Sequence, residues 1–167
     1  MSKVSILVTG ASGQLGQCLK ATLPAGLQDQ VLWTDVDTLD ITDPLALKQS
    51  FSQNNFDYCI NTAAYTAVDK AESEAKTAFA LNATAVHTLA EECAANNTVL
   101  IHLSTDYVFD GKKEAPYSET DDPNPINAYG RTKLAGEQAI QSSQEISEMV
   151  TKAQEEVTEI ISKRVKE

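Results

Sequence analysis

Short continuous apolar runs alternate along the chain with segments in which apolar residues recur every three or four positions. The apolar runs are bounded by polar residues or glycine, which is typical of parallel strands buried on both faces. They predict strands at residues 4–9, 31–33, 56–61 and 99–104. The intervening segments predict helices at residues 13–23, 43–53 and 76–96. This alternation indicates an α/β fold with right-handed crossovers.

The last segment, residues 144–167, has no glycine, proline or aromatic residue. Its apolar side chains alternate three and four positions apart, as along the seam of a coiled coil, at Ile146, Val150, Ala153, Val157 and Ile160. We expect an amphipathic helix of about six turns here. Such a helix either packs on the domain before it or pairs two chains as a homodimer.

Composition narrows the possible partners and the compartment. The net charge of −11 comes without a basic cluster, which argues against nucleic acid and anionic membrane as partners. No apolar run is long enough to span a membrane, and the chain begins with a strand rather than a signal peptide, so we expect a cytoplasmic protein. Cys18, Cys59 and Cys93 have neither metal nor disulfide spacing and are expected to be reduced core thiols.

Three glycines follow the first predicted strand as Gly-x-x-Gly-x-x-Gly, at Gly10, Gly13 and Gly16. Gly10 permits a tight turn, Gly13 lets a pyrophosphate approach the backbone N–H groups of the helix that follows, and Gly16 allows close helix–strand packing. We therefore predict a dinucleotide loop that includes Gln14 and Leu15. The alternative is an ordinary glycine-rich turn.

An aspartate, Asp35, closes the second strand about twenty residues after the loop, where a carboxylate can bind the adenosine ribose. No arginine or lysine lies between Lys20 and Lys48 to bind a 2′-phosphate, which favours NAD slightly over NADP. Asp40 and Ile41 are candidates to flank the adenine. The alternative interpretation, equally favoured, is that Asp40 is a turn residue and Ile41 a core residue.

Tyr129 and Lys133 are four residues apart, so on a helix they lie on one face, one turn apart. An ammonium close to a phenol lowers the pKa of the phenol and makes it a usable proton donor at neutral pH. The spacing alone is weak, because it occurs by chance on many surface helices.

Four longer segments carry a family resemblance: NTAAYTAVDKAE at 61–72, LNA at 81–83, STDYVFDG at 104–111 and YGRTKLAGE at 129–137. With the glycine loop before them, they make residues 3–141 resemble the extended short-chain dehydrogenases/reductases. More narrowly, the chain resembles the dTDP-4-dehydrorhamnose reductases. The regulatory subunit of methionine adenosyltransferase shares much of this signature.

The resemblance implies a Rossmann-like doubly wound parallel sheet, NADH or NADPH as cofactor and a nucleotide-sugar substrate whose C4 carbonyl is reduced. It gives Thr105 the role of orienting that carbonyl, Tyr129 that of proton donor, and Lys133 that of binding the nicotinamide ribose. Ala63, Ala64 and Tyr65 would line the cofactor, while Val68 and Asp106 would lie beside the sugar. No metal site is implied, and His87 and His102 fall outside these roles as core or surface residues.

The chain departs from the family after Ser143, where the family continues with another strand and a smaller substrate domain. We therefore expect residues 1–143 to form an NAD(P)-binding domain, C-terminally truncated or fused to an unrelated helical tail at 144–167. Residues 99–104 would then form a sheet edge, and cofactor binding should survive better than turnover. Two alternatives to a reductase are a non-catalytic NAD(P)-binding regulatory or assembly module and an epimerase or dehydratase of the same group.

Overall fold

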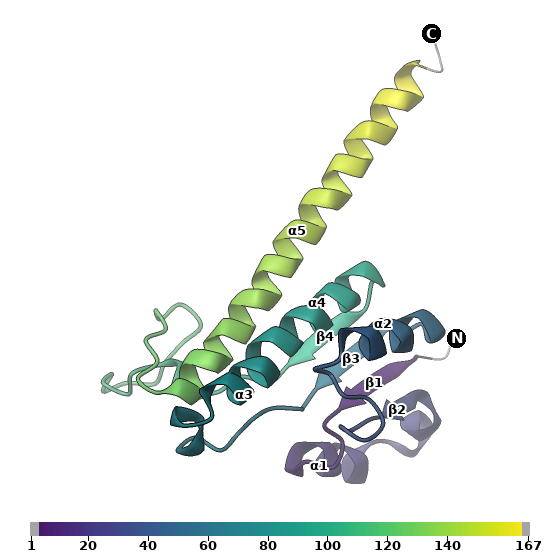
Figure 1. The fold of residues 1–167 in the computed structure, drawn as a ribbon. Coiled ribbons are helices and arrows are strands. Elements are labelled where there is room, and N and C mark those ends of the chain that lie inside the picture. Colours follow the sequence, from purple (N-terminus) through teal and green to yellow (C-terminus); the bar gives the residue numbers. More distant parts are fainter. Residues whose placement is uncertain (1–3, 165–167) are drawn as a thin grey trace.

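The computed structural model describes residues 4–164 and contains one parallel sheet flanked by helices (Figure 1). Its four strands are β1 (Ile6–Thr9), β2 (Val31–Trp33), β3 (Tyr58–Asn61) and β4 (Val99–His102). Their order is β2-β1-β3-β4, with all neighbours parallel. The predicted α/β class is confirmed, although three of the four strands are shorter than the apolar runs that predicted them.

The helices connect the strands across both faces of the sheet. They are α1 (Gln14–Thr22), α2 (Pro44–Gln53), α3 (Ala75–Phe79), α4 (Ala85–Ala95) and α5 (Ala128–Arg164), with short 3-10 turns η1 (Ala25–Gln30), η2 (Lys70–Glu72) and η4 (Asp106–Val108). The main core lies between the sheet and α2 and α4; its largest fully buried side chains are Leu7, Leu47, Phe51 and Leu89. In the order β2-β1-β3-β4, the step from β1 to β2 runs in the opposite direction to the steps from β2 to β3 and from β3 to β4. With right-handed connections, α1 therefore lies on the face of the sheet opposite to α2 and α4.

Helix α2 begins where its capping residues predict. The Asp43 side chain accepts hydrogen bonds from the backbone N–H groups of Leu45 (2.9 Å) and Ala46 (3.3 Å), and Pro44 occupies the first helical position. An N-cap carboxylate satisfies donors that have no partner within the helix.

The helix predicted at residues 76–96 is interrupted. The π-helical turn η3 (Ala80–Thr84) separates α3 from α4. Its Asn82 is buried, accepts from the backbone N–H of Tyr65 (2.8 Å) and donates to the hydroxyl of Thr132 on α5 (3.0 Å). The extra residue of the π turn thus accompanies an amide that joins three segments, as is common near functional sites.

The long helix α5 unites two segments that the sequence analysis separated. It runs for 37 residues without a break, so position 143 falls inside a helix. Nothing between Glu137 and Arg164 interrupts it, because that stretch contains neither glycine nor proline. The first turns pack against α4, whereas every side chain from Glu148 to Glu156 is exposed and the helix extends away from the sheet (Figure 1). Seam positions from Val157 onward lie outside the residues whose side chains are described.

Strand β4 is an edge of the sheet, as expected. Val99, Ile101 and Leu103 are 54%, 45% and 40% exposed, so one face of this edge is apolar and uncovered in the described part of the chain. Cys59 and Cys93 are buried free thiols, but Cys18 is exposed, so its prediction as a core thiol was wrong. It lies on the solvent side of α1. Within residues 4–164, no helix combines the length and apolar character that a membrane crossing requires.

Candidate functional site

The glycine loop is pressed against the end of the neighbouring strand. Gly10 has φ +67°, and a Cβ on it would lie 2.6 Å from the backbone nitrogen of Ala63. Only glycine fits this turn, for reasons of both backbone conformation and space. The loop therefore brings the N-terminus of α1 to the same sheet edge as the segment after β3.

A cavity of about 640 Å³ opens beside this loop, a size suited to a cofactor or other small ligand. It contains seven of the predicted cofactor residues. These are Gly10, Gly13, Asp35, Asp40, Ile41, Ala63 and Ala64. The structure thus brings together residues from the ends of three strands, at the edge where doubly wound sheets bind ligands.

Asp35 is held as a carboxylate by backbone N–H groups. One oxygen accepts from Ser12 of the glycine loop (2.7 Å) and the other from Val36 (2.8 Å). The hydrogen bond from Ser12, followed by that from Val36, lowers the pKa of Asp35 below its ordinary value. Each oxygen keeps a lone pair, so the carboxylate can accept from the hydroxyl groups of a ligand while anchoring the loop.

The remaining predicted cofactor residues lie outside the cavity lining. Gln14 and Leu15 are exposed at the start of α1, and Gly16 is buried against the loop. The hydroxyl of Tyr65 donates to Glu74 (2.7 Å), and this bond raises the pKa of Tyr65.

One wall of the cavity, formed by residues of α3 and η3, was not predicted from the sequence. Lys76, Thr77, Ala80 and Leu81 line it, and among the described residues that line the cavity Lys76 is the only lysine or arginine. Only Leu81 of these belongs to the matched LNA motif, and a motif match does not give the direction of a side chain.

Thr105 is the N-cap of the turn η4, which begins at Asp106 shortly after β4. The Thr105 hydroxyl accepts from the backbone N–H of Tyr107 (3.3 Å) and donates to Asp106 (3.2 Å). Both residues line a second hollow, between η4, the following loop and α5.

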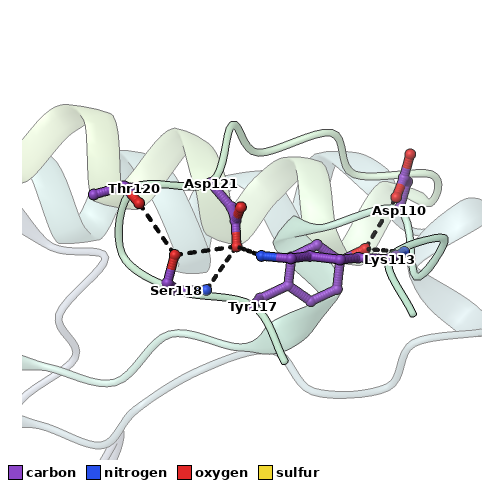
Figure 2. Close-up of polar contacts among 6 residues, drawn as sticks. All are labelled: Asp110, Lys113, Tyr117, Ser118, Thr120 and Asp121. Atoms are coloured by element: carbon purple, nitrogen blue, oxygen red, sulfur yellow. Dashed lines mark hydrogen bonds and ion pairs between the residues drawn. The ribbon is translucent and has the colours of Figure 1, made fainter. Parts of the chain in front are cut away.

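The loop beside this hollow is ordered by its own polar side chains (Figure 2). Lys113 forms an ion pair with Asp121 (2.5 Å), which also accepts from the backbone N–H of Ser118 (2.7 Å). The Tyr117 hydroxyl donates to Asp110 (3.0 Å), and the Tyr117 ring stacks on Phe109 at 4.2 Å. The loop that forms one wall of the hollow is therefore ordered by hydrogen bonds, an ion pair and ring stacking among its own residues.

Tyr129 and Lys133 lie in the first two turns of α5, only 8% and 2% exposed. Tyr129 packs edge-to-face on Tyr107 at 5.6 Å between ring centroids and contacts the small cluster joined by Val68. A Cβ on Gly130 would lie 2.1 Å from the carbonyl oxygen of Tyr107. The structure thus presses the tyrosine helix directly onto the turn that follows Thr105.

The Nζ of Lys133 makes its contacts away from Tyr129. Its Nζ donates to the backbone carbonyl of Leu103 (2.5 Å) and lies 3.3 Å from His102 Nε2. Within residues 4–164 no hydrogen bond joins Lys133 to the Tyr129 hydroxyl. Burial lowers the pKa of Lys133, and the carboxylate of Glu137 opposes this effect.

Comparison with known proteins identifies the family. The RmlD substrate binding domain matches residues 4–152. The chain belongs to this family. It is 47% identical over 136 residues to a dTDP-4-dehydrorhamnose reductase of Mycolicibacterium smegmatis, covering 81% of this chain and 41% of the relative.

Solved structures of the family superpose on the same portion. A dTDP-4-dehydrorhamnose reductase from Bacillus anthracis in complex with NADP has a TM-score of 0.81 at 37% identity, covering 84% of this chain and 50% of that one. One from Clostridium acetobutylicum has a TM-score of 0.79 at 41% identity, covering 83% and 49%. The chain therefore spans about half the length of the family members it matches.

Proposed function

We propose that this chain forms the nicotinamide-binding portion of a reductase that converts dTDP-4-dehydro-L-rhamnose to dTDP-L-rhamnose. The observation that carries the proposal is the cavity at the glycine loop, with Asp35 on its wall, together with the buried Tyr129 and Lys133 in the first turns of α5. The family members named above are reductases of this substrate, which favours this function over the regulatory and epimerase alternatives.

The cavity fits a nicotinamide dinucleotide. Among the described residues, a Cβ on Gly13 would meet only the carbonyl oxygen of Gly10, so the Gly13 backbone is open to close approach, and the start of α1 offers N–H groups to a pyrophosphate. The Asp35 carboxylate suits ribose hydroxyl groups and would repel a 2′-phosphate, which supports NADH. Lys76 supplies the one nearby cation that could offset this repulsion, and the Bacillus anthracis relative carries NADP.

The proposed chemistry assigns one task to each of three side chains. A bound reduced nicotinamide would supply the hydride. Thr105 would orient the C4 carbonyl through its hydroxyl, and Tyr129 would donate the proton that the developing alkoxide needs. Lys133 would bind the nicotinamide ribose and favour release of the tyrosine proton.

The substrate is expected to lie at the second hollow rather than in the glycine-loop cavity. Asp106 lines that hollow beside Thr105, and Val68 packs in the cluster that holds Tyr129. Because the chain spans about half the length of its relatives, we expect cofactor binding to be retained better than substrate turnover.

The proposal is tested by calorimetric titration with NADH and NADPH, followed by turnover assays with the sugar nucleotide. We expect the chain to bind NADH, and Tyr129→Phe to leave that affinity unchanged while lowering turnover about 10²–10⁴-fold, the usual contribution of a general acid. Tyr58→Phe is the matched control, because Tyr58 lies on β3 and is 41% exposed. If neither NADH nor NADPH binds, the proposal is refuted.

We further propose that the exposed seam of α5 pairs two chains in a reducing, cytoplasmic setting. Ile146, Met149 and Val150 are 55%, 63% and 50% exposed on the part of α5 that leaves the sheet. The three free cysteines support the reducing compartment.

A further inference from the structure

A row of polar side chains crosses three strands and ends at Lys133. Thr9 on β1 is paired in register with Asn61 on β3, and Asn61 with His102 on β4. Thr9 and Asn61 are each 1% exposed. These groups have no part in the proposed chemistry, although they lie on the face of the sheet that meets α5.

The orientation of the Asn61 amide is fixed by its neighbours. Its Oδ1 accepts from the backbone N–H of Ala63 (3.1 Å) and from the hydroxyl of Thr9 (2.6 Å). A backbone N–H can only donate, so the atom facing it is the oxygen. The Asn61 NH₂ group therefore faces His102 Nδ1 at 3.0 Å.

This orientation fixes the protonation of His102. Since an amide NH₂ only donates, Nδ1 accepts and carries no proton, and the single proton of the neutral ring is on Nε2. Burial and the nearby Lys133 lower the pKa of His102 to about 4, so the ring is neutral at physiological pH. Its Nε2–H points at Lys133 Nζ, 3.3 Å away.

The direction of this hydrogen bond selects one form of the lysine. An ammonium has three donors and no acceptor, so it would oppose the Nε2–H group, whereas a neutral amine can accept from it. The same amine can still donate to the Leu103 carbonyl at 2.5 Å. Asn61, His102, Lys133 and Leu103 then form one unbroken donor-to-acceptor chain.

We propose that His102 is a positioning residue for Lys133: locked by Asn61 as the Nε2–H tautomer, it donates to the lysine and favours the neutral amine. Two ionisable groups flank Lys133 on α5, Tyr129 one turn before it and Glu137 one turn after it. Glu137 favours the ammonium, so it opposes His102. The balance between them sets how readily Lys133 leaves this position to engage Tyr129 or a ribose.

The inference rests on the proposed role of Lys133, but its test reads the two side chains directly and does not require bound nucleotide. Nitrogen-15 NMR of histidine-labelled full-length chain distinguishes the tautomers. We expect His102 to show a protonated Nε2 and an unprotonated Nδ1 from pH 6 to 8. His87, the only other histidine, is the internal control, because its ring is exposed beside Glu91. A protonated Nδ1 on His102 in this range would overturn the proposal.

The second measurement is the titration of Lys133 in wild type, His102→Leu and His102→Gln, with the signal assigned by its loss in Lys133→Met. We expect an upward shift of the Lys133 pKa in His102→Leu, because the donor that favours the neutral amine is gone. Glutamine places an amide N–H near the position of Nε2 and should restore the wild-type titration. An unchanged lysine titration in both variants, or equal upward shifts in both, contradicts the proposal. If the leucine variant does not fold, the tautomer in wild type and the titration of the glutamine variant still decide it.

Discussion

At the scale of single residues, Asp35 has a structural contact in addition to the ligand-binding role predicted from the sequence. The sequence predicted a ribose ligand at the end of β2, and the structure also makes this carboxylate the acceptor that holds Ser12 of the glycine loop. Loop geometry and the proposed ligand recognition would therefore depend on the same side chain.

We expect Asp35→Asn to weaken NADH binding and narrow the difference between NADH and NADPH. The neutral amide retains oxygen for one ligand hydroxyl but removes the negative charge that repels a 2′-phosphate, a change of about 1–2 kcal/mol, or roughly five- to thirty-fold, for charged hydrogen bonds. Calorimetry with both nucleotides measures it. Asp37→Asn, an exposed change nearby, is the control, and an unaltered selectivity in Asp35→Asn would show that another group reads the ribose.

Gly130 shows how closely α5 approaches the turn after Thr105. We expect Gly130→Ala to lower the free energy of unfolding by about 1–3 kcal/mol, since the new Cβ would meet the Tyr107 carbonyl at 2.1 Å and force a shift. Urea denaturation measures this loss. Gly26→Ala is the matched control, with nothing within 4 Å of its Cβ. Equal stabilities of the two variants would contradict the close approach.

At the scale of elements, the sequence predicted those features that depend on local pattern. The Asp43–Pro44 start of α2 follows from capping, and the α/β class follows from the alternation of apolar runs with helical segments. The π turn at Ala80–Thr84 could not be predicted, because its cause is the buried Asn82, which bonds to residues 17 and 50 positions away. The continuity of α5 was also missed, since the change in composition after Ser143 indicated a new element although no helix breaker accompanies it.

In the candidate site, too, the features set by local sequence pattern were predicted and those set by contacts distant in the sequence were not. Glycine spacing and the position of Asp35 predicted the cavity residues near the loop, where the backbone alone determines the geometry. Lys76 and His102 were not predicted, because their roles arise from side chains on α3 and β4 that meet residues distant in the sequence.

At the scale of the whole molecule, His102 links the pH to the stability of the fold. Its pKa is about 4 in the folded chain against an ordinary 6.5, so between these values the unfolded state binds a proton that the folded state does not. The resulting stabilisation is present above pH 6.5 and is lost as the pH falls toward 4, by about 3 kcal/mol in all.

We expect the free energy of unfolding of His102→Gln to fall less than that of wild type between pH 7 and pH 4.5. Denaturant titrations at both pH values measure the difference, and comparing the two proteins removes the contribution of carboxylates that titrate in the same range. Parallel losses in the two proteins would show that His102 is not the responsible group.

The proposed pairing of two chains also belongs to this scale. We expect the double variant Ile146→Asp, Val150→Asp to shift the molecular mass in analytical ultracentrifugation from dimer to monomer, because it places charges on the exposed seam. Glu148→Gln and Lys152→Gln, off that seam, are controls. A monomeric wild-type chain at micromolar concentration would contradict the pairing.

The unbroken course of α5 has a mechanical consequence. A helix of 37 residues is a rod about 55 Å long, and Tyr129 and Lys133 occupy its first two turns. Buried Ser143 shows that α5 is held by the domain along its first 16 residues, so the free arm begins about four turns after Tyr129. The remaining 21 residues form an arm about 30 Å long, and a force on its distal end is resisted by this packing before it reaches tyrosine and lysine.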